Sequence, residues 1–297
     1  MYEQTKLMFM YCVTPVHMGS GQAVGVVDNP IQRERHTGHP NMAGSGVKGA
    51  LRHHLRGKVG TDLVKRLFGP ETNAAEHAGA VSFGDGQLIA FPVRSLKQGF
   101  VYAVSEVTLA RLKRLASLAS MSVEWNLPVL DGKRALVCNK KVLSDGKLVL
   151  EAFNYDAGES DELQAVAGWI ADNALPHDGA YDFFKEKIRR DLVLVSEEDM
   201  GYFVENSTVV EPHVRIDHTT GTADGGALFY TENLPPETLL ISPVFSSKER
   251  SGNGDGMKSS EVMDKLHSSL DSQLVQFGGD ATTGRGQVVL HFCGGGE

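Results

Sequence analysis

The sequence has little cysteine, and its few cysteines are scattered. There are three in the chain, none in a Cys-x-x-Cys pair: Cys12, Cys138 and Cys293. This pattern excludes a zinc ribbon and a secreted disulfide scaffold. The chain also lacks a run of about 18 apolar residues, so we expect no membrane span. Its first residues lack the basic start and the small-residue cleavage site of a signal peptide, so we expect a cytoplasmic protein.

Length and composition are those of an ordinary globular protein, except for glycine. The 297 residues allow one elaborated domain or two small ones, and hydrophobic residues make up 41% of the chain. Glycine is in surplus, with 33 residues, which is about 11% of the chain against a typical value of about 7%. The glycines gather in short loops with no collagen or linker pattern. Such loops often occur where a backbone approaches a ligand closely.

Charge is unevenly distributed along the chain. The net charge of −8 disfavours a nucleic-acid partner when it is taken alone. Residues 30–66, however, contain eight Lys or Arg and two acidic residues, so this window is basic on an acidic chain. Screening confines the influence of each charge to about 8 Å at physiological salt, so a local basic patch can still bind a polyanion. A solvated amphipathic helix explains the same pattern equally well.

The order of the expected elements predicts an α+β fold. Helices are expected over 45–67, 106–118, 162–172, 181–194 and 259–277. Strands are expected over 6–17, 136–138, 148–153, 239–245 and 287–293, with a strand pair over 80–93 and an irregular hairpin over 208–230. Without residues 120–235, this order is compatible with a ferredoxin-like β-α-β-β-α-β core. Many RNA-binding modules, including the RRM, have such a frame.

His17 ends the first expected strand, and Asp28 lies in the loop that follows it. Asp28 precedes Asn-Pro, and a turn onto its own backbone is one explanation for it. The other explanation is a carboxylate beside an anionic ligand, where it binds a divalent ion or polarises a hydroxyl. His17 is either structural or a donor to a phosphate oxygen.

Two further loops are rich in glycine and suit phosphate chemistry. Residues 44–52 open a helix, where free N–H groups attract anions, and a capped helix with solvated basic side chains is the alternative. Residues 278–286 suit backbone phosphates, and a helix end running into a tight turn is the alternative. Neither loop matches a P-loop or a dinucleotide-binding motif. The polar residues of interest in them are Ser45, Lys48, Arg52, Thr282, Thr283 and Arg285.

Four stretches of this sequence together resemble one known family. They are Val27-Asp28-Asn29-Pro30-Ile31-Gln32-Arg33-Glu34-Arg35-His36-Thr37-Gly38, Gly44-Ser45-Gly46-Val47-Lys48-Gly49-Ala50-Leu51-Arg52, Phe91-Pro92-Val93-Arg94-Ser95 and the loop 278–286. The chain is identified as a member of the RAMP superfamily, similar to the repeated backbone (Cas-seven-type) subunit of type III-B CRISPR effector complexes, the Cmr complexes. The resemblance covers essentially the whole chain.

The resemblance implies an architecture and a set of partners. It implies a single RAMP domain over 1–297: a ferredoxin-like (RRM-like) palm at about 1–120 and 236–297, helical insertions at about 120–200, and a β-hairpin thumb at about 205–235. The implied partners are a CRISPR guide RNA, a target RNA, neighbouring copies of the chain and other type III-B subunits. The thumb of each copy would kink the guide–target duplex.

The resemblance also implies catalysis. The target RNA would be cut at six-nucleotide intervals, with its own 2′-hydroxyl as nucleophile. Asp28 is the implied general base or outer ligand of a divalent ion, His17 acts in the same step, and Glu232 contributes from the segment after the thumb. The implied guide-binding residues are Ser45, Lys48, Arg52, Thr282, Thr283 and Arg285. The ion, Mg²⁺ or Mn²⁺, would be transient and shared with RNA, because the sequence offers no dedicated metal cage.

Two other classes of function stay open at this point. One is a purely architectural subunit that binds guide RNA without cutting a target. The other is a small-molecule enzyme that holds a nucleotide in its glycine-rich loops.

Overall fold

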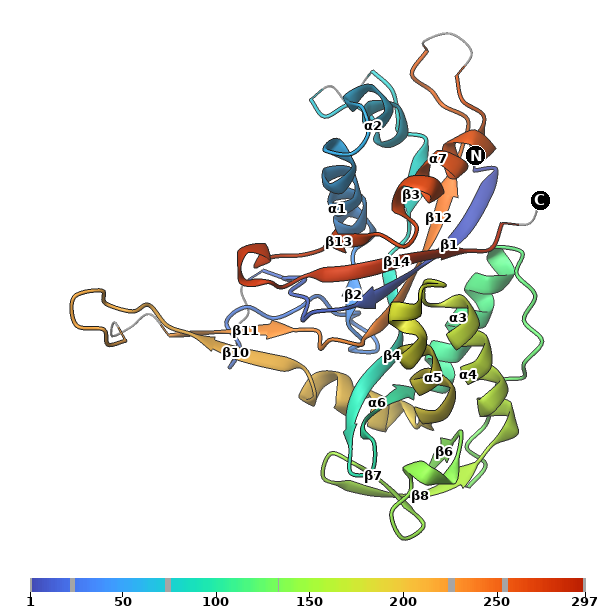
Figure 1. The fold of residues 1–297 in the computed structure, drawn as a ribbon, viewed down its shortest axis with the longest axis vertical. Coiled ribbons are helices and arrows are strands. Elements are labelled where there is room, and N and C mark those ends of the chain that lie inside the picture. Colours follow the sequence, from blue (N-terminus) through green and yellow to red (C-terminus); the bar gives the residue numbers. More distant parts are fainter. Residues whose placement is uncertain are drawn as a thin grey trace.

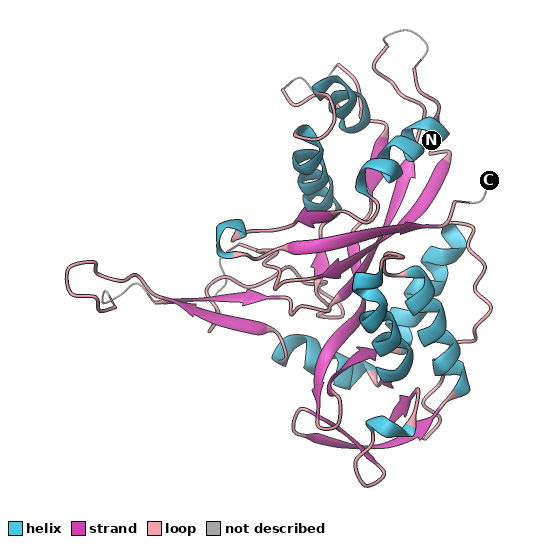
Figure 2. Cartoon of the chain, in the orientation of Figure 1, coloured by secondary structure: helices cyan, strands magenta, loops and turns pink. Residues whose placement is uncertain are grey.

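A twelve-stranded mixed sheet with helices packed on both of its faces forms the body of the protein (Figure 1, Figure 2). The computed structural model describes residues 2–21, 25–72, 76–132, 134–223, 228–252 and 256–295. The fold is mixed α/β. A two-stranded hairpin, made separately from the sheet, projects from one side of this body.

Four antiparallel strands lie next to one another at the centre of the sheet. In spatial order they are β14 (Gln287–Cys293), β1 (Gln4–Cys12), β12 (Leu239–Ser246) and β4 (Gly86–Ser95). Successive side chains of a strand point to opposite faces. In β1, Met8 and Met10 accordingly enter one hydrophobic core, and Leu7 and Phe9 enter the other. Burial on both faces explains why this strand is apolar without alternation.

Helices cover each face of the sheet. One core contains residues of α1 (Gly44–Arg56), α2 (Thr61–Phe68), α6 (Glu197–Asn206) and α7 (Ser259–Leu270). The other contains residues of α3 (Glu106–Leu118), α4 (Asp161–Asn173) and α5 (Asp182–Asp191). The aromatic rings of Phe9 and Tyr11 are therefore buried and cannot stack on bases, as the exposed sheet aromatics of an RRM do. None of the described helices is both long and apolar enough to cross a membrane.

The sheet continues beyond β4 through five more strands. Their order is β5 (Gly99–Val104), β9 (Leu192–Val195), β6 (Ala135–Val137), β8 (Phe153–Glu159) and β7 (Lys147–Leu150). A single pair, Ser95 with Leu150, joins β7 back to β4. Short strands complete the sheet: β2 (Asn41–Met42) beside β4, β3 (Val81–Phe83) beside β12 and β13 (Leu274–Gln276) beside β14.

The projecting hairpin consists of β10 (Val209–His213) and β11 (Phe229–Asn233). Residues 224–227, which follow β10 and precede β11 in the sequence, lie outside the described residues. Three short 3₁₀ turns complete the list of elements: η1 (Lys140–Val142), η2 (Gly179–Tyr181) and η3 (Ala281–Thr283).

Several expected elements differ from those observed. The helix expected at 45–67 is two helices, α1 and α2, separated by residues 57–60 with a glycine at each end of the break. The strand pair expected at 80–93 is not a hairpin, because β3 and β4 both pair with β12. The region 120–200, for which the resemblance implied helical insertions, contributes four strands to the sheet, and the strands expected at 136–138 and 148–153 correspond to β6 and β7.

Two expected helices are too long, because each of them is followed by a strand that the sequence pattern did not indicate. The helix expected at 181–194 ends at Asp191, and the helix expected at 259–277 ends at Leu270. The Leu-Val-Leu-Val run of β9 is fully buried between β5 and β6, so strand pairing overrides the helical pattern. After α7, Asp271 is extended and Ser272 adopts φ 59°, so the chain leaves the helix and turns into β13.

Candidate nucleic-acid interface

The three loops singled out by sequence meet at one place. A cavity of about 210 Å³ is lined by residues from all of them, among them Gly19 of the first loop, Gly46 at the start of α1 and Gly278 of the third loop. These positions are far apart in sequence, so the fold rather than local spacing brings them together. Three of its nine lining residues are glycines, and the others include the apolar side chains of Met18, Met42, Val47 and Phe277.

The contact between His17 and the third loop requires glycine. The N–H of Gly279 donates to the carbonyl of His17 at 2.9 Å. Gly278 has φ +70°, and a Cβ built there would lie 2.1 Å from the His17 carbonyl oxygen. A Cβ on Gly19 would lie 2.9 Å from Nε2 of the same histidine. Glycine is therefore needed here for close backbone approach and for a left-handed conformation.

The imidazole of His17 is oriented by the hairpin. Its Nδ1 lies 2.7 Å from the carbonyl oxygen of Glu232 on β11. A carbonyl only accepts hydrogen bonds, so Nδ1 carries the proton in the neutral ring. Nε2 then holds the lone pair, and it has no hydrogen-bond partner among the described residues. In that neutral tautomer, Nε2 can accept a proton from a ligand.

Asp28 lies in the loop, and its side chain is held by the same strand, β11, that orients His17. The loop forms one parallel bridge with β11, between Asn29 and Thr231. Continuing this ladder would require Tyr230 to donate to Val27. Instead the N–H of Tyr230 donates to Oδ2 of Asp28 at 2.7 Å. The Asp28 side chain is exposed, and its Oδ1 is unbonded within the described part of the chain.

On the other side of the Asn29–Thr231 bridge, the carboxylate of Glu232 also replaces a backbone hydrogen-bond acceptor. The regular parallel partner of the Ile31 N–H would be the carbonyl of Glu232. The Ile31 N–H donates instead to Oε2 of Glu232 at 3.1 Å, which leaves that carbonyl for His17. Asp28 is thus held by Tyr230 and His17 by Glu232. These two residues lie two positions apart on β11, so their Cα atoms are about 6.5 Å apart.

The Glu232 side chain itself is buried and fully engaged. Its carboxylate also accepts from Nη2 of Arg33 at 2.5 Å and from Oγ1 of Thr208 at 3.0 Å. Glu232 is only 6% exposed. The resemblance implied that Glu232 contributes to the same step as Asp28 and His17. Nothing in the sequence indicated its contacts with Arg33, 199 residues away, and with Thr208, 24 residues away.

The predicted guide-binding residues on α1 fall into two groups. Ser45 is exposed at the start of the helix, and Lys48 is half-buried behind it. Desolvation, together with the nearby Arg52, lowers the pKa of Lys48. Arg52 is engaged by the protein: Nη2 donates to the Gly69 carbonyl at 2.7 Å and lies 3.5 Å from Glu71.

The predicted residues of the third loop also differ in availability. Thr282 and Thr283 are exposed in η3, although the hydroxyl of Thr283 donates to the Asp280 carbonyl at 2.8 Å. Arg285 forms an ion pair with Glu211 of the hairpin strand β10. The third loop is therefore attached to the hairpin as well as to His17.

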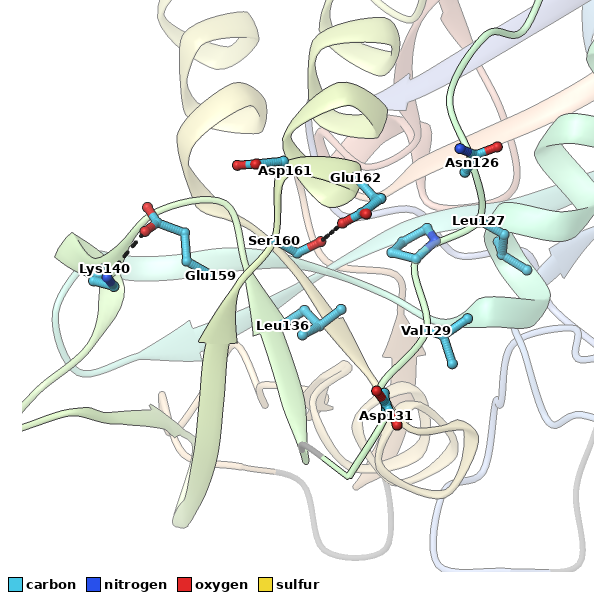
Figure 3. A pocket seen from close by; sticks show the side chains of 11 residues that line it. Asn126, Leu127, Val129, Asp131, Leu136, Lys140, Glu159, Ser160, Asp161 and Glu162 are labelled. Carbon is cyan, nitrogen blue, oxygen red and sulfur yellow. Dashed lines mark hydrogen bonds and ion pairs between the residues drawn. The ribbon is translucent and has the colours of Figure 1, made fainter.

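A larger cavity of about 710 Å³ lies elsewhere, beside the start of α4 (Figure 3). Its lining includes Asp131, Glu159, Asp161 and Glu162, and Lys140 lies 3.5 Å from Glu159. Excess negative charge makes this cavity unsuited to a phosphate chain.

No group of three or more metal-ligating side chains occurs within the described ranges. An ion at the interface would therefore need ligands from RNA in addition to Asp28. Its exposed Oδ1 is compatible with that arrangement, because Mg²⁺ is commonly bound by one or two carboxylates plus substrate phosphates.

Comparisons with known proteins identify the family. The family described as the RAMP superfamily matches residues 9–289. The Pyrococcus furiosus protein named CRISPR system Cmr endoribonuclease Cmr4 is 35% identical over 290 residues, which cover 96% of this chain and 94% of that relative.

Solved structures agree with this result. The crystal structure of oligomeric Cmr4 from Pyrococcus furiosus has a TM-score of 0.75 and 28% identity, and the match covers 98% of this chain and 99% of that one. A chain in the cryo-EM structure of the type III-B Cmr-beta complex bound to cognate target RNA has the same fold, with a TM-score of 0.73, 20% identity and 98% of both chains covered. The chain belongs to the RAMP superfamily and, within it, to the family of Cmr4.

Proposed function

We propose that the chain is the guide-RNA-binding backbone subunit of a type III-B Cmr complex and the endoribonuclease that cuts its target RNA. The position of Asp28 is the main observation behind the proposal: an exposed carboxylate is fixed to β11 of the projecting hairpin, the strand that also orients the imidazole of His17. The family supports it, since the relative from Pyrococcus furiosus is named an endoribonuclease.

In this proposal the central strands form a ferredoxin-like palm. The spatial order β14-β1-β12-β4, all antiparallel, is that of a β-α-β-β-α-β unit with α1 and α7 as its two helices. The palm comprises about 1–120 and 236–297, the insertion about 120–200, and the thumb about 205–235 around β10 and β11. All belong to a single RAMP domain.

Guide RNA would lie across the converging loops rather than on a sheet face. Ser45 and Lys48 at the start of α1, with Thr282 and Thr283, are placed to contact sugar and phosphate. Such contacts hold RNA without reading its sequence. Arg52 and Arg285 would join them only by exchanging their carboxylate partners for phosphate. Neighbouring copies and other type III-B subunits would extend the RNA path.

Cleavage would use the target's own ribose. The 2′-oxygen attacks the adjacent phosphorus, the P–O5′ bond breaks, and a 2′,3′-cyclic phosphate and a 5′-hydroxyl result. Asp28 or His17 removes the 2′-proton, and a proton from water goes to the leaving O5′. General-base assistance typically contributes about 10²–10⁴-fold. The hairpin, inserted in the duplex, would bend the target so that nucleophile and phosphorus align, which supplies further rate.

A divalent ion, Mg²⁺ or Mn²⁺, would be held by Asp28 together with RNA phosphates. When bound, it would neutralise charge on the phosphate under attack. Asp28 serves in this account either as general base or as outer ligand of the ion, and both roles need the exposed Oδ1.

The test is Asp28→Asn in the assembled complex with guide and matched target. Removing the charge should abolish cuts at six-nucleotide intervals while leaving target binding unchanged. Asp62→Asn, at an exposed position on α2, is the matched control and should cut normally. Unchanged cutting by Asp28→Asn would refute the catalytic assignment. A wild-type complex that binds target without cutting would favour the architectural alternative.

A further inference from the structure

We propose that Arg33 is a positioning residue that acts through Glu232: it locks the loop carrying Asp28 to the hairpin, so that the hairpin sets where the target is cut. This inference rests on the proposed function. It assigns to Arg33 and Glu232 a role in holding Asp28 and no contact with RNA.

The first step is the geometry of the Arg33 guanidinium. Nη2 donates to Oε1 of Glu232 at 2.5 Å, and Nη1 donates to the Gly38 carbonyl at 2.9 Å. The Glu232 side chain is 8% exposed and that of Arg33 is 21% exposed, so water screens this pair weakly. A planar guanidinium with two engaged nitrogens has a fixed orientation. Arg33 therefore joins the loop to the hairpin strand rigidly.

The second step is what Glu232 does with its other oxygen. Oε2 accepts from the N–H of Ile31, in place of the regular backbone partner of that N–H, while Oε1 also accepts from the hydroxyl of Thr208, which directly precedes β10. One carboxylate thus joins the loop, β11 and the residue preceding β10. Without Arg33, its charge would be buried with only neutral donors, which is costly.

The third step is the short distance from this clamp to Asp28. Only Asn29 and Pro30 separate Asp28 from Ile31. Asp28 is held at Tyr230 and Ile31 at Glu232, so two carboxylates fix both ends of the same short segment on β11. Release at the Glu232 end would let the segment slide or lift. A displacement of about 1 Å can cost about 10²-fold in rate.

The consequence is that the hairpin would fix the position of the cut. If the hairpin inserts between bases, the rigid connection places Asp28 at a constant distance from the insertion point. Loosening the Arg33–Glu232 interaction should then slow cutting and spread the cut positions. Target affinity should stay the same, because in this proposal Arg33 does not contact the RNA.

The experiment uses the assembled complex with guide and matched target RNA. Arg33→Met, Glu232→Gln and the double variant are compared for single-turnover cutting rate, cut positions and target affinity. We expect each single variant to cut about 10–100-fold more slowly, with cuts spread over neighbouring positions. The double variant should be no slower than the slower single variant, because both changes break one interaction. Arg33→Lys should recover part of the rate.

Arg111→Met is the matched control, since Arg111 pairs with Glu34 farther along the same loop at 2.9 Å and with comparable burial. It should keep the rate and the sharp cut positions. Wild-type rate and positions in Arg33→Met would overturn the inference, and so would multiplicative losses in the double variant, which would mean that Glu232 acts on RNA independently. If Arg33→Met does not assemble, Thr208→Val replaces it, and unchanged cutting would count against the clamp.

A second measurement keeps the inference separate from the proposed function. Amide hydrogen exchange in the free protein should become faster at Ile31 and Tyr230 in Arg33→Met and stay unchanged in Arg111→Met. Hydrogen exchange can be measured in the free protein even if the wild-type complex does not cut RNA. Unchanged exchange at both amides would reject the clamp, whatever Asp28→Asn shows about catalysis.

Discussion

The guanidinium of Arg285, predicted from sequence to bind phosphate, is paired with the carboxylate of Glu211 on the hairpin. Both side chains are about one-quarter exposed, at 27% and 25%. An RNA phosphate must therefore displace a protein carboxylate before it can use this cation.

Glu211→Gln should accordingly strengthen RNA binding. Removing the competing charge frees Arg285, so affinity should rise a few-fold and the salt dependence should steepen by about 0.7 in log–log slope for one added phosphate contact on a single strand. Titration of RNA at several salt concentrations measures both. Arg285→Gln should have the opposite effect, and an equal affinity for all three proteins would show that Arg285 does not meet RNA.

Gly278→Ala should disrupt the contact between the third loop and His17. Its Cβ would meet the His17 carbonyl at 2.1 Å, in addition to the strain of φ +70°. Gly221→Ala is the matched control, because φ is +69° there and no atom lies within 4 Å. We expect Gly221→Ala to lose about 1 kcal/mol and Gly278→Ala clearly more, with RNA affinity falling as well. Equal melting temperatures for the two variants would contradict this steric argument.

Glu237 should make stability depend on pH. Burial raises the pKa of this carboxyl from 4.5 to about 7, and the hydroxyl of Tyr11 donates to it. The folded state keeps its proton to higher pH than the unfolded state does, so stability should fall as pH rises from about 4.5 to about 7 and then level off.

Glu237→Gln should remove that dependence, because the amide does not titrate. At pH 8 the variant should melt a few degrees above wild type, on the order expected for 1–2 kcal/mol, and at pH 4.5 the difference should shrink. Thermal melts at the two pH values test this. An equal shift at both would show that the effect is not one of ionisation.

Arg66 stabilises a buried carboxylate far from the interface. Its Nε and Nη2 donate to Glu249 at 2.7 and 2.6 Å, and the Glu249 side chain is 0% exposed. These bonds lower the pKa of Glu249 to about 2. Arg66→Met should cost about 3–5 kcal/mol at pH 7, because it leaves a buried charge unpaired. Urea unfolding measures the loss, and Arg66→Met with Glu249→Met should regain much of it; no regain would mean that packing, not charge, dominates.

Elements bounded by local signals were predictable. The helix expected at 106–118 matches α3, where Ser105 caps the first turn, and the strand expected at 287–293 matches β14. The Leu-Val-Leu-Val run of β9 was not predictable, because its pairing partners lie at least 55 residues away on β5 and β6 and decide between helix and strand.

At the candidate interface, too, local signals were predictable and long-range contacts were not. The loops were recognisable by their glycine and basic residues, and Asp28 and His17 by a resemblance. Arg33, however, finds its carboxylate 199 residues later, and nothing in local spacing identifies such a partner. Likewise, Arg52 and Arg285 were read as free cations, since the sequence does not reveal that Glu71 and Glu211 neutralise them.

Strand β4 belongs to both halves of the sheet: its first part pairs with β12 and its second part with β5. A ten-residue strand shared in this way leaves no flexible joint between the central strands and the added ones. Heating should therefore produce a single calorimetric endotherm, and a proline introduced at Ala90 should abolish the folding of both halves together.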